Sequence, residues 1–174
     1  MKKLFVSKEL SKKIKQIKKD DKTVALLHGV FDILHIGHIS YFEEIKKYSD
    51  KLIISITDDE FVNKGPGRPM FKINERVKML SKIDLVDFII ISKSVTAENI
   101  IKELKPNFFA KGRDYKVKKN DITENIYKEI KAIKSVGGRF ITSNSPMHSS
   151  TKIINNETDF LSDNLKDYVK NINK

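Results

Sequence analysis

The sequence predicts an α/β protein with a Rossmann-like, doubly wound, parallel five-stranded sheet and helices on both faces. Short apolar runs alternate about five times along the chain with segments of helical periodicity. This alternation is typical of a parallel sheet whose strands are connected through helices. The composition agrees, because 39% apolar residues can form a packed core and 33% charged residues can cover its surface. In such sheets, ligands bind beyond the carboxyl ends of the strands.

The elements follow one another in a regular order. Leu10, Ile14 and Ile17 repeat at helical spacing in a lysine-rich segment and predict a helix over 8–19. Apolar runs then predict strands at 24–27, 52–57, 86–92, 108–110 and 139–142. Periodic segments between them predict helices at 38–48, at 74–83, from Thr96 and Glu98 to Leu104, and at 122–136, the last ended by Gly137-Gly138. Residues 63–71 form a glycine–proline loop.

Three parts follow from this pattern. Residues 1–21 are expected to form an N-terminal lead-in helix, and residues 22–155 form the main domain. Residues 156–174 are polar at first and then carry Leu161, Leu165 and Val169 at helical spacing. This final helix could cap the domain or begin a linker to a further domain.

Composition and charge narrow the class of protein. The 174 residues contain no cysteine, which excludes disulfides and thiolate metal sites, and no apolar run reaches membrane-spanning length. The net charge is +11, but the lysines are spread along the whole chain and no cluster interleaves them with aromatic residues. We therefore expect a cytoplasmic protein that binds neither nucleic acid nor membrane.

The most informative stretch is 24–38, where an apolar strand runs through a glycine turn into a helix. Free N–H groups and the helix dipole make a helix N-terminus a site for phosphate. His35 and His38 are three residues apart and fall on the same helical face. Gly37 between them leaves room for a phosphate close to the backbone. The arrangement suits chemistry at a nucleoside triphosphate.

The segment Gly29-Val30-Phe31-Asp32-x-x-His35-x-Gly37-His38 resembles the signature of the HxGH nucleotidylyltransferases. The resemblance covers roughly residues 22–155 and includes, in the family's order, Thr57-Asp58-Asp59, the Lys64-to-Pro69 loop, Arg76, Val86-Asp87, Lys105-Pro106, Lys111-to-Tyr115 and Ser149-to-Ile154. The chain is most similar to the cytidylyltransferase-like group, which includes glycerol-3-phosphate cytidylyltransferase and the nucleotidyltransferase domain of bifunctional heptose synthesis enzymes.

The resemblance implies that a nucleoside triphosphate reacts with a sugar or polyol phosphate and releases pyrophosphate. The implied catalytic residues are His35, His38 and Lys64. The implied nucleotide-binding residues are Gly29, Val30, Phe31, Asp32, Gly37, Arg76, Lys111, Gly112, Asp114, Ser149, Ser150 and Thr151. Asp32, Asp58, Lys64 and Arg68 are implied for the acceptor, with a capped turn as the alternative for Asp58. Mg²⁺ would enter with the triphosphate, without a protein ligand cluster.

The base and the acceptor stay open. We expect CTP and an acceptor that feeds surface polysaccharide such as capsule, although residues 143–148 lack the arginine–threonine pair of the glycerol-type enzymes. The alternative is ATP with a heptose-type sugar 1-phosphate. A homodimer is expected because relatives are commonly dimers.

Two rival classes fit the sequence less well. His35-Ile-Gly-His38 and Lys78-to-Lys82 imitate the motifs of class I aminoacyl-tRNA synthetases, but the chain is too short for such an enzyme. A non-catalytic basic module that binds nucleic acid or regulates a partner is disfavoured by the intact histidine pair.

Overall fold

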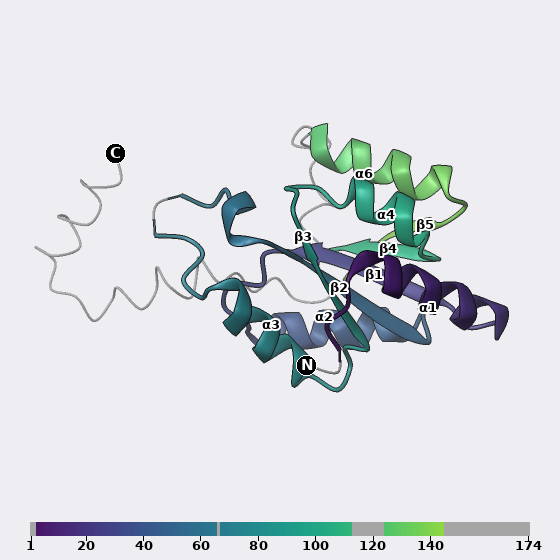
Figure 1. The fold of residues 1–174 in the computed structure, drawn as a ribbon, viewed down its shortest axis with the longest axis horizontal. Coiled ribbons are helices and arrows are strands. Elements are labelled where there is room, and N and C mark those ends of the chain that lie inside the picture. Colours follow the sequence, from purple (N-terminus) through teal and green to yellow (C-terminus); the bar gives the residue numbers. More distant parts are fainter. Residues whose placement is uncertain (1–2, 66, 113–123, 145–174) are drawn as a thin grey trace, which may run out of the picture.

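The computed structural model describes residues 3–65, 67–112 and 124–144. The order of elements is α1 (Ser7–Lys19), β1 (Val24–Gly29), α2 (Ile36–Lys46), β2 (Lys51–Thr57), the 3₁₀ helix η1 (Asp59–Phe61), α3 (Ile73–Ser81), β3 (Phe88–Ser92), α4 (Glu98–Leu104), β4 (Phe108–Lys111), α6 (Glu124–Ser135) and β5 (Arg139–Thr142). Strands and helices alternate as the hydrophobic pattern predicts (Figure 1).

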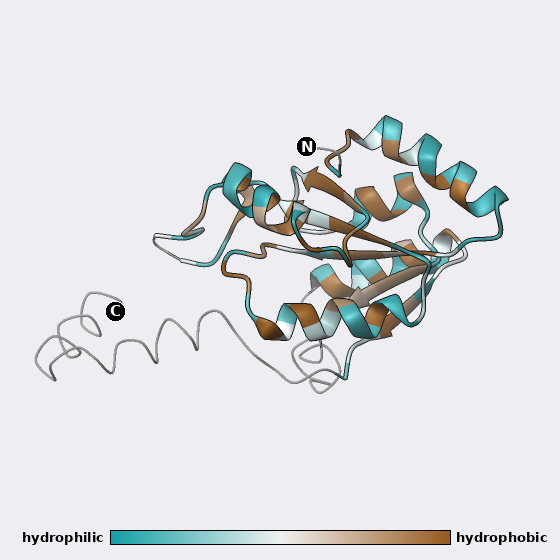
Figure 2. Cartoon of the chain, turned by 90° about the horizontal axis from the view of Figure 1, so that it is seen from below, coloured by the Kyte–Doolittle hydropathy of each residue, from teal (hydrophilic) through white to brown (hydrophobic). Residues whose placement is uncertain are grey.

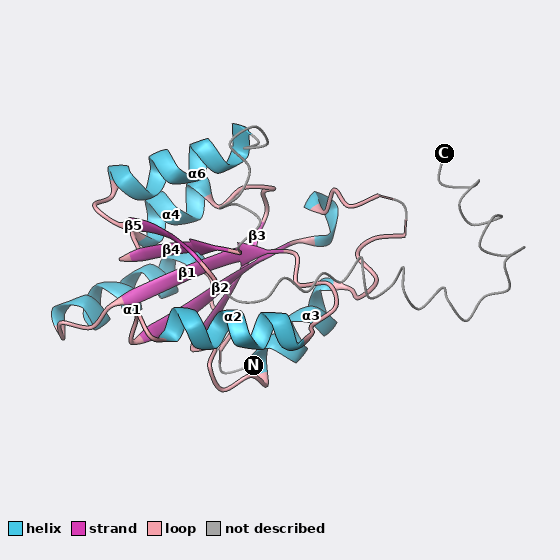
Figure 3. Ribbon diagram, turned by 180° about the vertical axis from the view of Figure 1, so that it is seen from behind, coloured by secondary structure: helices cyan, strands magenta, loops and turns pink. Residues whose placement is uncertain are grey.

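The sheet has five strands in the order β3-β2-β1-β4-β5, and every neighbouring pair is parallel. Helices α1, α4 and α6 pack on one face, called the α1 face below, and α2 and α3 pack on the other, called the α2 face. Figure 3 shows α4 and α6 on one side of the sheet, with α2 and α3 on the opposite side. The expected doubly wound parallel sheet is confirmed.

Alternation along each strand divides the core into two halves. In β1, Val24 and Leu26 join the core under the α1 face, whereas Ala25 and Leu27 join the core under the α2 face. Strands buried on both faces read as continuous apolar runs, which is why the sequence shows no polar alternation there. Figure 2 shows the hydrophobic strands enclosed by helices, with the hydrophilic residues of α1 turned outward.

The strand order reverses at β1, so the switch point, where open α/β sheets form a ligand-binding crevice, lies between the carboxyl ends of β1 and β4. Such a reversal is the usual ligand site of open α/β sheets. Helix α2 follows β1 in the chain, so its N-terminus lies at the same end of the sheet as the carboxyl end of β1. The fold thus brings the predicted histidine motif to the switch point.

Most predicted boundaries agree within a few residues. One difference is the start of α4, where Ala97, and not Thr96, is the residue before the helix, and no side chain caps it. The carboxylate of Glu129 accepts a hydrogen bond from Ala97 N at 2.9 Å instead. The predicted helix at the end of the chain lies outside the described residues. Among the helices that the structure describes, none combines the length and hydrophobicity of a membrane-spanning segment.

Candidate active site

The two histidines of the motif lie against each other at the start of α2. His35 is the residue before the helix, with extended backbone angles (φ −143°, ψ 170°). The ring centroids of His35 and His38 are 3.9 Å apart. The backbone N–H of His35 donates to His38 Nδ1 at 3.4 Å, which assigns the proton of a neutral His38 ring to Nε2. The local sequence therefore presents an N–H donor beside the helix N-terminus.

The surroundings of His38 disfavour its positive charge. Burial, and then the charges of His35 and Lys64, lower the pKa of His38 from 6.5 to about 3. His38 is therefore neutral near pH 7 in the protein without ligand. The charge of Lys64 acts on His38, so the cationic end of this loop side chain is near enough to His38 to affect its pKa.

The contacts of Phe31 explain why an aromatic residue follows the glycine turn. Its backbone is in the left-handed region (φ 50°), and its ring lies 5.5 Å from the ring of His38 and 5.9 Å from that of Phe42. A Cβ at Gly29 would lie 3.3 Å from this ring. Gly29 and Phe31 thus support the histidine pair from the core side.

Asp32 anchors the glycine–proline loop. Its carboxylate is buried, and Oδ1 accepts hydrogen bonds from the backbone N–H groups of Met70 (2.8 Å) and Phe71 (3.2 Å). Its Oδ2 pairs with Arg68 Nε at 2.7 Å. The structure therefore shows Asp32 bound to the protein itself, where the sequence predicted a contact to substrate.

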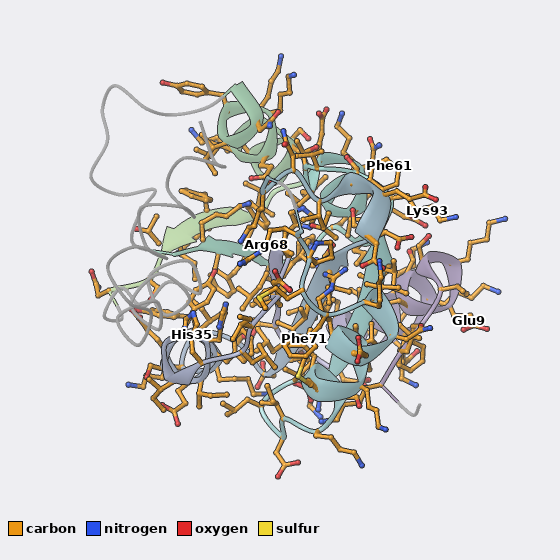
Figure 4. All side chains as sticks on the ribbon, turned by 90° about the vertical axis from the view of Figure 1, so that its left-hand side faces the viewer. Glu9, His35, Phe61, Arg68, Phe71 and Lys93 are labelled. Carbon is orange, nitrogen blue, oxygen red and sulfur yellow. The ribbon has the colours of Figure 1, made fainter. Side chains whose placement is uncertain are left out.

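Arg68 and Lys64 make the loop cationic. The Nη2 atom of Arg68 is buried and makes no hydrogen bond to any residue that the structure describes. Desolvation and the charge of Arg68 lower the pKa of Lys64, although Asp32 opposes the shift. In Figure 4, Arg68 and Phe71 lie near the middle of the view and His35 lies to their left, while Glu9 of α1 is at the far edge. Because Arg68 pairs with Asp32, three residues before His35, the loop lies beside the turn that leads to the histidines.

Arg76, which the resemblance implies for nucleotide binding, has a structural role in the protein without ligand. Its side chain is completely buried. Its guanidinium donates to Phe71 O (2.9 Å), Val30 O (2.6 Å), Thr57 O (2.9 Å) and Asp59 Oδ1 (2.6 Å). In the sequence, a helical arginine with apolar neighbours indicates a solvated or phosphate-binding side chain. In the structure, Arg76 connects the turns after β1 and β2 to the loop.

Asp58 adopts the second of its two expected roles. Its Oδ1 accepts a hydrogen bond from Asp59 N at 2.8 Å and caps η1. No contact to an acceptor is needed to explain this carboxylate.

Lys111 lies at the end of β4, but its ammonium is turned into the protein. It is 3.0 Å from Glu129 Oε2 and 5.4 Å from the ring centroid of Phe109. In the protein without ligand, Lys111 thus forms an internal ion pair, and the contact with phosphate that the resemblance implies stays a prediction. Gly112 follows, and a Cβ there would meet no atom of the described part of the chain within 4 Å.

Sequence reasoning missed Glu129, which is the acidic partner in this ion pair, and His28, which is buried near Lys111. One signal was available for Glu129, because it lies three residues after Ile126 and four before Ile133, on the apolar face of its helix. His28 carries no such signal, since it continues the apolar run of β1.

Four predicted nucleotide-binding residues lie outside the described residues, namely Asp114, Ser149, Ser150 and Thr151. Within the described ranges, no group of three histidine, aspartate or glutamate side chains could hold a metal ion.

A parallel sheet with a histidine pair and a cationic loop at its switch point defines an α/β protein suited to nucleotide phosphates. The model of the cytidylyltransferase-like family matches residues 26–156, and the chain belongs to this family of nucleotidyltransferases.

The relatives agree with the family. The chain is 37% identical over 142 residues to the bifunctional protein HldE of Campylobacter fetus, a match that covers 80% of this chain and 29% of the relative. It is 39% identical over 97 residues to HldE of Pseudomonas entomophila, which covers 55% of this chain and 20% of the relative. The chain thus spans less than a third of the length of these curated relatives.

Two solved structures share the fold. The lipopolysaccharide core biosynthesis protein of Thermoplasma volcanium has a TM-score of 0.59 and 26% identity, and the match covers 72% of this chain and 99% of that one. Pantoate-β-alanine ligase of Francisella tularensis, solved with an ATP analogue and β-alanine, has a TM-score of 0.57 and 16% identity over 86% of this chain and 69% of that one. The second match supports the fold alone.

Proposed function

We propose that this chain transfers the nucleotidyl group of ATP to the phosphate of a heptose-type sugar phosphate and releases pyrophosphate. The observation that carries the proposal is the histidine pair at the N-terminus of α2, with ring centroids 3.9 Å apart and the Lys64 ammonium nearby. The chain is similar to HldE, and the heptose-type enzymes of this group transfer AMP. This similarity favours ATP over the CTP that the sequence alone suggested.

The reaction is an in-line substitution at phosphorus. A phosphate oxygen of the acceptor attacks the α-phosphorus, the bond to the bridging oxygen breaks, and that oxygen leaves with the pyrophosphate. His38 Nε2–H and the His35 ring donate to the phosphate oxygens as charge builds, and the dipole of α2 adds to this stabilisation. Mg²⁺ carried by the triphosphate would neutralise part of its charge. Because no covalent intermediate forms, positioning and charge are the main contributions of the protein.

The cationic loop is assigned to the acceptor side of the reaction. Lys64 and Arg68 would contact phosphate, and the buried Nη2 of Arg68 offers a donor without a described partner. Asp32 would act through this loop, because it holds Arg68 and the backbone at Met70. The acceptor would then feed a surface carbohydrate, which agrees with the role of the Thermoplasma neighbour in lipopolysaccharide core biosynthesis. We also propose that the protein is a homodimer, as expected from the sequence.

CTP is the second candidate, and the name of the matched family favours it. Against it stands the stretch 143–148, which reads Ser-Asn-Ser-Pro-Met-His and lacks the arginine–threonine pair of the glycerol-type enzymes.

The test is pyrophosphate release with ATP or CTP against sugar and polyol phosphates in the presence of Mg²⁺. We expect release with ATP and a heptose-type phosphate. His35→Ala and His38→Ala should each lower kcat by about 100-fold or more, as when a transition-state donor is lost. Asn99→Ala, an exposed residue of α4, is the control and should keep full activity. Near-normal turnover of both histidine variants, or silence of the wild type with every acceptor, would contradict the proposal.

A further inference from the structure

We propose that Glu129 is a positioning residue for the nucleotide, because it holds the carboxyl end of β4 at the switch point through Lys111. The inference rests on the proposed function, since it assigns this residue to the nucleotide half of the same site. Glu129 is distant in sequence from the histidine motif and lies in α6.

One carboxylate joins three elements. Glu129 is 2% exposed, its Oε1 accepts the hydrogen bond of Ala97 N at 2.9 Å, and its Oε2 lies 3.0 Å from Lys111 Nζ. It therefore links α6, the start of α4 and the last residue of β4. Both oxygens are engaged, so the carboxylate has a defined orientation.

His28 belongs to the same buried cluster. Its Nδ1 is 2.9 Å from Ser55 Oγ, and its Nε2 is 3.1 Å from Val95 O. His28 and Glu129 thus hold the segment between β3 and α4 at two points, Val95 and Ala97. The charge of Lys111 acts on His28, since burial and then this charge lower the pKa of the imidazole to about 4. The cluster therefore lies beneath the ends of β1, β2 and β4 on the α1 face.

Stability alone does not explain a charged pair at this place. Burying an ion pair costs desolvation, and an apolar pair of similar size is often neutral or more stable. Glu129 is on the apolar face of α6, where Ile126 and Ile133 are also buried. A leucine would suit that position for packing alone. The ion pair gives instead a fixed geometry to the end of β4.

The end of β4 is where the nucleoside would lie. The α-phosphate would sit on the histidine pair beyond β1, and the nucleoside attached to it would extend into the crevice between β1 and β4. A Cβ on Gly112, directly after Lys111, would meet no atom of the described residues within 4 Å. Lys111 would serve the nucleotide by placing this backbone, because its ammonium is held by Glu129.

The experiment compares Glu129→Gln with the wild type in equilibrium binding of ATP with Mg²⁺ and in steady-state kinetics. The amide oxygen can still accept from Ala97 N, but the negative charge opposite Lys111 is lost. We expect Kd and KM for ATP to rise about tenfold, as when a residue that orients a binding group is changed, with kcat and the KM of the acceptor within about twofold. Glu98→Gln removes the same charge from the exposed pair with Lys102 and should bind ATP as the wild type does.

A second variant covers the case in which Glu129→Gln fails to fold. Lys111→Met combined with Glu129→Gln leaves no unpaired buried charge, keeps an acceptor for Ala97 N and should fold, yet it should show the same weaker binding of ATP. Wild-type affinity in either variant overturns the inference, even where the melting temperature falls. Failure of the proposed function looks different, because the wild type itself would then bind neither ATP nor CTP.

Discussion

At the scale of single residues, Arg76 shows how a charged side chain can become part of the interior. Its guanidinium has four described acceptors in the turns after β1 and β2 and in the loop, with distances of 2.6 to 2.9 Å. The planar, forked donors of arginine match these acceptors, whereas an ammonium cannot reach them together. The residue therefore positions the loop that carries Lys64 and Arg68.

Arg76→Lys tests this role. The change leaves buried acceptors without donors, and we expect the free energy of unfolding to fall by about 3 kcal/mol. Urea denaturation followed by circular dichroism measures it. Arg139→Lys, at an exposed position of β5, is the matched control and should change the stability little. Equal stability of Arg76→Lys and wild type would contradict the assignment.

A second residue, His28, should make the protein sensitive to acid. Burial, and then the charge of Lys111, lower its pKa from 6.5 to about 4, so the unfolded chain takes up this proton first. The stability that depends on neutral His28 is complete above pH 6.5 and is lost as the pH falls toward 4. The loss amounts to roughly 3 kcal/mol.

The measurement is the free energy of unfolding of the wild type and of His28→Gln between pH 7.5 and about 4. Glutamine can still hydrogen-bond but does not titrate, so the slope against pH should be smaller for the variant. The pKa of His38 is lowered in both proteins, so its contribution cancels when the two free energies of unfolding are subtracted. Parallel curves would show that His28 does not carry the effect.

At the scale of elements, Asp87 joins α2 and β2 to the segment that leads into β3. Its carboxylate accepts from Lys46 Nζ, Lys51 Nζ and Leu52 N at 2.8 to 2.9 Å. Desolvation raises the pKa of Asp87, but the hydrogen bonds from Lys46, Lys51 and Leu52 outweigh it and hold the pKa below 3.8. This contribution is therefore present above pH 3.8 and is lost as the pH falls below that value.

Asp87→Asn should lower the free energy of unfolding at pH 7 by about 2 kcal/mol, because two lysines lose a charged acceptor. Chemical denaturation at pH 7 measures the loss, and Asp84→Asn on the exposed surface nearby is the control. Activity per folded molecule should be unchanged, since Asp87 lies at the amino ends of the strands, opposite the site. A drop in activity without a drop in stability would contradict this placement.

At the scale of the whole molecule, the site is assembled from segments that meet only at the switch point. The turn after β1 supplies the histidines, the connection between β2 and α3 supplies the cationic loop, and α6 holds the end of β4. A ligand that bridges these segments stabilises the folded state by mass action.

Nucleotide binding should therefore raise the melting temperature. ATP with Mg²⁺ at about a hundred times its Kd adds roughly 2.7 kcal/mol, which corresponds to an increase of about 5–10 °C for a domain of this size. Differential scanning fluorimetry measures the increase, with Mg²⁺ alone as the control. A larger increase with CTP than with ATP would reverse the choice of base, and no increase with either would count against the site.

The sequence by itself determined the alternation of strands and helices and the histidine motif at the start of α2. Both are local, because hydrophobic periodicity and a strand–turn–helix are defined within about fifteen residues. The rings of Phe31 and His38 lie 5.5 Å apart, and a short stretch of chain is enough to bring them together.

Only the tertiary structure decided which charged residues are turned inward. Asp32 meets Arg68, Arg76 meets Asp59, and Lys111 meets Glu129, each across a connection that the strand order brings together. The sequence alone does not distinguish a solvated lysine, arginine or glutamate from one that is buried in an ion pair. The difference is set by the packing of distant segments, because burial and a partner within about 3 Å exist only after the sheet has formed.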